Sequence, residues 1–215
     1  MIPRIIHQIW IGDQPLPEKY IYFIEQVKKI NPNYEHKLWG NEVFNLYPDD
    51  PFLNHYRKNT EIYKWAYICD RLRLLILRDY GGIYVDIDAE PIKSFDYVLN
   101  QLSEKHTYFA GVRPIGHDDN PMPLIDCTVI GSEPRSRMID FLISLYVDIN
   151  WAWMGRGLSD KMWTELGPDI ALFDYKYFYD TEITDKTIVL HDTEDNRLWS
   201  WCGGRPYHEE GNNWK

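Results

Sequence analysis

The sequence predicts an α/β fold in which a single, mainly parallel sheet is flanked by helices. Short apolar runs typical of buried strands alternate with segments of helical periodicity along most of the chain. At 215 residues and 44% apolar composition, the chain is long and apolar enough to bury the core of one such domain. We therefore expect residues 1–215 to form a single catalytic or binding domain, with its ligand beyond the carboxyl ends of the strands.

The expected elements follow one another in a regular order. The longest is a helix over residues 62–79, where Ile68, Leu72, Leu75 and Ile76 recur at helical spacing and Gly81-Gly82 supplies a stop signal. The expected strands cover residues 4–11, 35–39, 83–87, 108–112, 127–130 and 188–190. The other expected helices cover residues 17–30, 41–47, 51–59 and 133–147.

The stretch Gly81-Gly82-Ile83-Tyr84-Val85-Asp86-Ile87-Asp88 carries the strongest chemical signal. Alternation along a strand predicts that Tyr84, Asp86 and Asp88 share one face, with the two carboxylates roughly 6.6 Å apart. Two such carboxylates suit Mg²⁺ or Mn²⁺ bound together with a phosphate-bearing ligand. The alternative is a solvent-facing acidic edge, because the Asp-x-Asp pattern is short.

The helix before this strand carries a second pair of charges. Ala66, Asp70, Arg73 and Leu77 fall on one helical stripe, and Asp70 and Arg73 lie one turn apart. One interpretation is an exposed ion pair worth a few tenths of a kcal/mol. The other gives both residues a role at the ligand, where Arg73 contacts a phosphate and Asp70 accepts hydrogen bonds from sugar hydroxyls.

Taken together, these motifs resemble glycosyltransferase family 32 and, more distantly, the glucosylating domains of large clostridial toxins. A narrower resemblance is to the first module of a multi-domain chlorovirus glycosyltransferase. The matching segments are Ile-Pro-Arg-Ile-Ile-His-Gln-Ile-Trp at residues 2–10, Asp70-x-x-Arg73, and Gly81 to Asp88. Beyond residues 1–12 and 62–96, only His191 and the pair Ser200-Trp201 correspond to the family's signatures. The resemblance implies the type A glycosyltransferase fold with one nucleotide-sugar site.

The resemblance also implies roles for individual residues. The end of the first strand is expected near the nucleobase and ribose, where Trp10 either stacks on the base or closes the edge of the core. The donor-binding residues implied are Gln8, Ile9, Trp10, Tyr84 and Asp86, with Asp70 on the donor sugar and Arg73 on the sugar or diphosphate. The implied ligands for Mn²⁺ or Mg²⁺ are Asp88, which binds directly, Asp86, which contacts the ribose or the metal through water, and His191.

Family membership would further imply transfer with retention of anomeric configuration, from a nucleotide sugar that is expected to carry uridine. A front-face reaction needs no protein nucleophile, whereas a covalent route needs a carboxylate beneath the sugar, for which Asp126 is the candidate. The alternative for Asp126 is a loop carboxylate that caps a strand. The polar loop 114–123 could face the acceptor or be a solvated turn, and residues 198–204 could close over the diphosphate.

Composition excludes some functions and leaves others open. A net charge of −10 argues against nucleic-acid binding and against electrostatic anchoring on an anionic membrane. The three cysteines form no zinc pattern, and the start of the chain has no signal-peptide layout, so we expect a cytoplasmic monomer or one domain of a longer chain. The alternatives to a hexosyltransferase acting on a glycan or glycoconjugate are a non-catalytic sugar-binding module and an Asp-x-Asp phosphatase.

Overall fold

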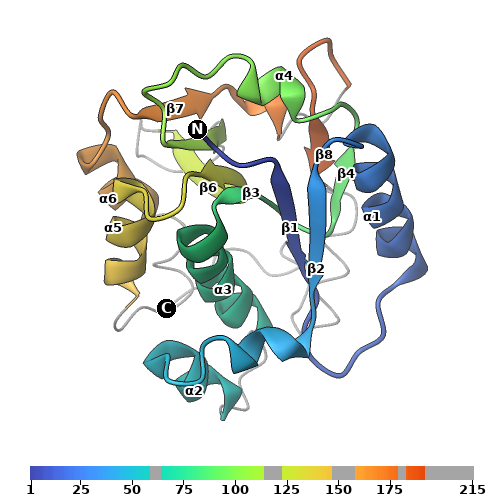
Figure 1. Cartoon of the computed structure of the whole chain (residues 1–215), viewed down its shortest axis with the longest axis vertical. Coiled ribbons are helices and arrows are strands. Elements are labelled where there is room, and N and C mark those ends of the chain that lie inside the picture. The colour runs from blue at the N-terminus through green and yellow to red at the C-terminus, as the bar shows by residue number, and fades with distance from the viewer. Residues whose placement is uncertain (59–63, 114–122, 147–157, 179–182, 192–215) are drawn as a thin grey trace, which may run out of the picture.

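The computed structural model describes residues 1–58, 64–113, 123–146, 158–178 and 183–191 (Figure 1). Its centre is a six-stranded sheet of order β2-β1-β3-β6-β5-β7. The strands are β1 (Ile5–Ile9), β2 (Glu35–Trp39), β3 (Gly82–Val85), β5 (Tyr108–Arg113), β6 (Leu124–Ser132) and β7 (Ile170–Phe173). The β1–β2, β1–β3 and β5–β7 pairs are parallel, whereas β6 runs antiparallel to both of its neighbours. Parallel pairs are thus in the majority, and the predicted α/β fold class is confirmed.

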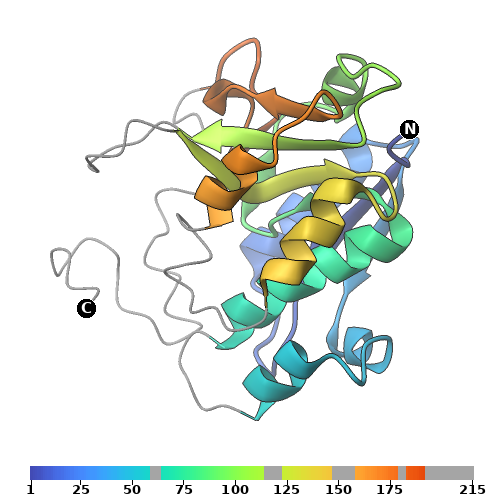
Figure 2. The same ribbon diagram turned by 90° about the vertical axis from the view of Figure 1, so that its left-hand side faces the viewer.

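Helices cover both faces of this sheet (Figure 2). On one face lie α2 (Pro51–Arg57), α3 (Lys64–Tyr80), α5 (Arg137–Leu145), α6 (Leu158–Thr164) and the 3₁₀ helix η1 (Asn41–Asn45). On the other lie α1 (Glu18–Ile30), α4 (Asp96–Leu99), the 3₁₀ helix η3 (Tyr175–Tyr177) and a two-stranded antiparallel sheet of β4 (Ala89–Pro91) and β8 (Val189–His191). None of the helices among the described residues is long and apolar enough to cross a membrane.

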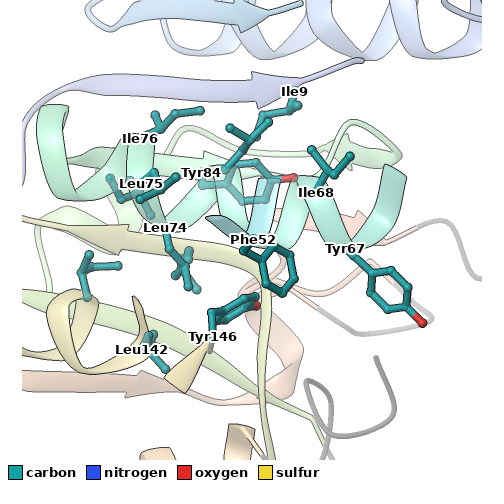
Figure 3. Close-up of a cluster of buried hydrophobic side chains, with 14 of the residues drawn as sticks. Ile9, Phe52, Tyr67, Ile68, Leu74, Leu75, Ile76, Tyr84, Leu142 and Tyr146 are labelled. Atoms are coloured by element: carbon teal, nitrogen blue, oxygen red, sulfur yellow. The ribbon is translucent and has the colours of Figure 1, made fainter. Parts of the chain in front are cut away.

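The larger hydrophobic cluster lies between the sheet and α3 (Figure 3). Ile68 and Ile76 of α3 pack there with Tyr84 of β3 and Leu142 of α5, as the helical spacing predicts. Neighbouring residues of β3 point the other way, because Ile83 and Val85 belong to the cluster on the opposite face. β3 is therefore buried on both faces, as expected for a central strand.

The predicted helix stop at Gly81-Gly82 is confirmed. The N–H of Gly81 donates to the carbonyl of Leu77 at 2.9 Å and closes the last turn of α3. Gly81 and Gly82 have φ angles of +63° and +98°, which favour glycine. A Cβ at Gly82 would lie 2.5 Å from the carbonyl oxygen of Ile5, so the close approach of β1 also requires glycine there.

A buried histidine in the middle of β1 bonds to the last residue of β2 and to the residue that precedes β3. The indole Nε1 of Trp39 donates to Nδ1 of His7 at 3.1 Å, which places the proton on Nε2 for the 2.8 Å bond to the Gly81 carbonyl. His7 is fully buried, and burial lowers the pKa of its imidazole to about 4. The folded protein therefore holds His7 neutral through mildly acidic pH.

We expect this histidine to make stability depend on pH. The unfolded chain takes up a proton near pH 6.5 and the folded chain only near pH 4, so the free energy of unfolding falls as pH drops through that window. The loss is a few kcal/mol at most, at about 1.4 kcal/mol per unit of pKa difference. Urea unfolding of His7→Gln at pH 7 and pH 5 should show a smaller fall than wild type. The exposed His55, changed to Gln, serves as the control, and an equal fall in His7→Gln and wild type would contradict the assignment.

Several elements differ from the sequence-based expectations. The strand expected over residues 83–87 ends at Val85, and the helix expected from residue 133 begins at Arg137, where the Ser136 side chain accepts from the N–H of Ile139. The helix expected over residues 41–47 is the shorter 3₁₀ helix η1 (Asn41–Asn45). The strands β4 and β7 and the helices α4 and α6 were not predicted from the sequence. The short strand expected over residues 188–190 is β8 (Val189–His191), which pairs with β4 rather than with the main sheet.

Candidate active site

The two aspartates of the Asp-x-Asp motif lie in a turn at the carboxyl end of β3. The backbone N–H of Asp86 still donates to the Thr128 carbonyl of β6 at 2.9 Å, but the next residues leave the sheet. The N–H of Ala89 donates to the carbonyl of Asp86 at 3.1 Å and closes the turn that contains Asp88. Strand alternation therefore does not place Asp88 on the face of Asp86 as predicted, because Asp88 lies beyond the end of β3.

The face shared by Tyr84 and Asp86 is as predicted. The Tyr84 hydroxyl donates to Oδ1 of Asp86 at 2.6 Å. The Arg73 guanidinium carbon lies 4.6 Å from the centre of the Tyr84 ring, and its Nη2 lies 3.6 Å from the same Asp86 oxygen. The end of β3 and the middle of α3 thus bring three of the sequence-predicted site residues into contact.

Arg73 is the centre of this group. Its Nη2 forms an ion pair with Asp70, and its Nη1 donates to the carbonyl of Cys127 at 2.7 Å. The side chain of Arg73 is 10% exposed and that of Asp70 is 19% exposed, so the exposed-pair interpretation is wrong. A nearly buried guanidinium with these partners orients the carboxylates beside it.

Electrostatics at Asp70 are dominated by burial. Burial raises the pKa of its carboxyl to about 6, the Arg73 charge opposes this rise, and the carboxylates of Asp86 and Asp126 add to it. The carboxylates of Asp86, in the turn after β3, and of Asp126, in β6, are therefore close enough to act on the charge of Asp70 in α3. Arg73 lies among them as the compensating cation.

Asp126 lies inside β6 rather than in a loop. The β5–β6 register jumps between Ala110, which pairs with Ile130, and Gly111, which pairs with Asp126, so residues 127–129 form a bulge. Oδ1 of Asp126 accepts from both the N–H and the hydroxyl of Thr128, each at 2.8 Å. The same bulge provides the Cys127 and Thr128 carbonyls that hold Arg73 and the Asp86 amide.

This bulge is the part of the site that sequence reasoning missed. The local signal was the Asp-x-Thr pattern at Asp126 and Thr128, which is typical of a side chain that folds back on a nearby amide. Its consequence for Arg73 depends on pairing between strands far apart in sequence, which the local pattern does not reveal.

The end of β1, where the nucleobase is expected, lies next to the Arg73 and aspartate side chains, because β1 and β3 are parallel neighbours. Trp10 follows β1, is partly buried, and its indole N–H donates to the Gln14 carbonyl at 2.9 Å. Ile9 is buried, and the fully buried Gln8 places its Oε1 2.8 Å from Nε2 of His36. The exposed part of Trp10 and the backbone are therefore what this strand end can offer to a ligand.

For His191 the structure describes the backbone position only. In the β4–β8 pair it lies opposite Ala89, the residue that follows Asp88, so the chain brings the two predicted metal ligands to neighbouring positions. Among the side chains described, no group of three or more His, Cys, Asp or Glu is arranged to hold a metal ion. One or two carboxylates completed by substrate phosphates and water are nevertheless what Mg²⁺ and Mn²⁺ accept, so the aspartates of the turn fit such an ion.

The remaining predicted contacts fall outside the described residues. These are the acceptor-facing part of the polar loop at 114–122, the Ser200-Trp201 pair and the segment 198–204. Cys202 also lies there, whereas Cys69 and Cys127 lie in the described part of the chain and form no disulfide within it.

Comparisons with known proteins show which proteins the chain is similar to. Residues 17–108, which include both aspartates of the turn and the Asp70–Arg73 pair, match the family model described as a glycosyltransferase sugar-binding region containing a DXD motif. An uncharacterized glycosyltransferase of Acanthamoeba polyphaga mimivirus is 37% identical over 90 residues, which cover 41% of this chain and 36% of that protein. Inositol phosphoceramide mannosyltransferase 3 of Schizosaccharomyces pombe is 34% identical over 102 residues, or 46% of this chain and 28% of that protein. The chain therefore spans about a third of the length of these curated relatives.

Solved structures agree on the fold. The match to the PaToxG glycosyltransferase covers 77% of this chain and 70% of that chain, with 22% identity and a TM-score of 0.59. The match to a glycosyltransferase involved in the glycosylation of the major capsid of PBCV-1 covers 91% of this chain and 96% of that chain, with 12% identity and a TM-score of 0.53. The resemblance to DXD-containing glycosyltransferases is thus confirmed, and the fold is that of the type A glycosyltransferases.

Proposed function

We propose that this domain is a metal-dependent, retaining glycosyltransferase that moves a hexose from a nucleoside-diphosphate sugar to a hydroxyl of a glycan or glycoconjugate. The observation that supports this best is the convergence of Asp70, Arg73, Tyr84 and Asp86 at the carboxyl end of β3. That edge of an α/β sheet is where ligands bind, and the matched DXD segment contains all four residues.

In the proposed site the chain's own residues bind and orient the donor. Asp88 and His191 would hold Mn²⁺ or Mg²⁺, with Asp86 contacting it through water or contacting the ribose. When bound, such an ion supplies Lewis-acid stabilisation of the negative charge that develops on the leaving diphosphate. Asp70 accepts hydrogen bonds from the donor sugar, and Arg73 keeps Asp70 and Asp86 in place while adding positive charge near the leaving group.

Retention requires the acceptor to arrive on the face that the diphosphate leaves, or a covalent intermediate. Asp126 is close enough to raise the pKa of Asp70, which puts a second carboxylate near the proposed sugar position. There it stabilises positive charge on an oxocarbenium-like sugar, or attacks the sugar in the covalent route. Trp10 is proposed to face the nucleobase at the end of β1.

The experiment measures release of nucleoside diphosphate from UDP-, GDP- and dTDP-sugars, with Mn²⁺, Mg²⁺ or EDTA, in the presence and absence of simple glycoside acceptors. A uridine donor is favoured, and a mannose-bearing donor belongs in the panel because a relative is named a mannosyltransferase. Metal-dependent release from one donor supports the proposal and identifies the donor class. Anomeric analysis of a transfer product by NMR then tests retention.

The main alternative is a sugar-binding module without turnover. Calorimetry on the same donors separates the two, because a module binds without releasing nucleoside diphosphate. Metal-independent binding with no release under any condition would contradict the transferase proposal and favour the module.

A further inference from the structure

Thr128 lies where β6 bulges toward the proposed donor site. Thr128 is buried, with 4% of the residue exposed, and its polar groups contact two residues assigned to the site. Its N–H and its hydroxyl both donate to Oδ1 of Asp126 at 2.8 Å. Its carbonyl accepts the N–H of Asp86 at 2.9 Å, at the start of the turn that carries the metal aspartates.

We propose that Thr128 is a positioning residue that sets the orientation of the Asp126 carboxylate relative to Asp86 and Arg73. This inference rests on the proposed function and assigns a role to a residue that the Asp-x-Asp motif does not include. Thr128 acts through Asp126 and is not itself placed against the substrate.

Geometry explains why a threonine suits this position. Two donors from one residue hold one carboxylate oxygen, so the Asp126 side chain cannot rotate without losing both hydrogen bonds. Hydrogen bonds to a charged acceptor are roughly twice as strong as neutral ones, so this pair is a stiff constraint. Loss of the hydroxyl would remove one of these two hydrogen bonds, and a single one constrains the staggered χ1 position of the carboxylate less than two do.

The bulge explains why this constraint reaches the rest of the site. Residues 127–129 have no partner in the β5 register, so on that side the Asp126–Thr128 hydrogen bonds brace the backbone, while on the other side Val129 pairs with Val85 of β3. The Cys127 carbonyl in this segment accepts from Arg73 at 2.7 Å. The segment that Thr128 braces through Asp126 thus also carries the carbonyl that accepts from the guanidinium.

The test compares Thr128→Val, which keeps the shape but removes the hydroxyl, with Thr128→Ser, which keeps the hydroxyl. We expect Thr128→Val to lower kcat about tenfold or more, the size of effect typical of a lost hydrogen bond to a charged group. Thr128→Ser should restore kcat to within about threefold of wild type, if the hydroxyl alone is what matters. The Kd for the nucleoside diphosphate with Mn²⁺ should stay unchanged in both variants, because Asp126 is placed near the sugar and not the nucleotide.

Ser132→Ala is the matched control. Ser132 is a fully buried hydroxyl at the other end of β6, bonded to the Ser136 hydroxyl at 2.7 Å. Ser132→Ala should lower Tm as Thr128→Val does while leaving kcat unchanged. If Thr128→Val does not fold, Thr128→Ser and Thr128→Ala differ by one oxygen atom and carry the same comparison.

Equal kcat in Thr128→Val and wild type would overturn the inference, and so would an equal loss in Thr128→Ser. Crystal structures of wild type and Thr128→Val supply a readout that does not need turnover, with a rotated Asp126 side chain expected in the variant. An unmoved Asp126 would also overturn the inference. Absence of turnover in wild type would instead count against the proposed function, and the crystal structures would still decide the role of Thr128.

Discussion

Asp88→Asn is expected to abolish metal-dependent turnover and leave the fold intact. The change replaces an anionic metal ligand by a neutral amide in a turn that follows β3 and lies outside the buried strand. We expect kcat/KM at limiting Mn²⁺ to fall by at least about 100-fold, since even loss of an outer-shell partner of a metal ligand costs 10–100-fold. The measurement is nucleoside-diphosphate release over a Mn²⁺ titration, with Tm measured in parallel.

Glu90→Gln gives the matched control for this variant. It removes one negative charge two residues further along, in β4, at a position that pairs with Leu190. This variant should keep the Mn²⁺ dependence of wild type. Wild-type activity in Asp88→Asn, with metal dependence verified, would remove Asp88 from the metal site.

The sequence predicted those parts of the site that arise within one element or between adjacent ones. The Asp70–Arg73 pair follows from helical spacing, and the Tyr84–Asp86 contact follows from strand alternation. Even the helix stop at Gly81 could be read locally, since positive φ favours glycine.

What could not be predicted depends on pairing between distant segments. The bulge in β6 is defined by the register of β5, and the position of His191 by its pairing with β4. Register is set by the packing of whole strands, so it cannot be read from the residues at the bulge alone. The same limit applies to Asp88, because the turn that contains it begins where Asp86 still bonds to Thr128 of β6.

The convergence of charges on Arg73 has a consequence for stability as well as for chemistry. Its guanidinium compensates the carboxylates of Asp70 and Asp86 and holds the carbonyl of Cys127. Arg73→Met keeps the length and apolar packing of the side chain but removes the donor to Asp70 and to the Cys127 carbonyl, whereas Asp86 keeps the Tyr84 hydroxyl. Removing one partner of a buried ion pair typically costs about 3–5 kcal/mol, and we expect a fall of that size in the free energy of unfolding.

The pH dependence of Arg73→Met provides the sharper test. Burial already raises the pKa of Asp70 to about 6, and loss of the nearby positive charge raises it further. A carboxyl with a raised pKa in the folded state binds its proton more tightly there than in the unfolded chain, so stability falls as pH rises from the unfolded pKa to the folded pKa. The deficit of Arg73→Met relative to wild type should therefore be larger at pH 8 than at pH 5 in urea unfolding.

Arg71→Met separates this effect from the loss of any buried arginine in α3. Arg71 pairs with Asp50 at 2.8 Å and donates to the Ile143 carbonyl at 2.9 Å, away from the aspartates of the proposed site. It should destabilise the fold without the pH-dependent deficit and without loss of donor binding. If the two variants lose stability in the same way at both pH values, Arg73 is a structural arginine, and the charges that orient the donor must lie elsewhere.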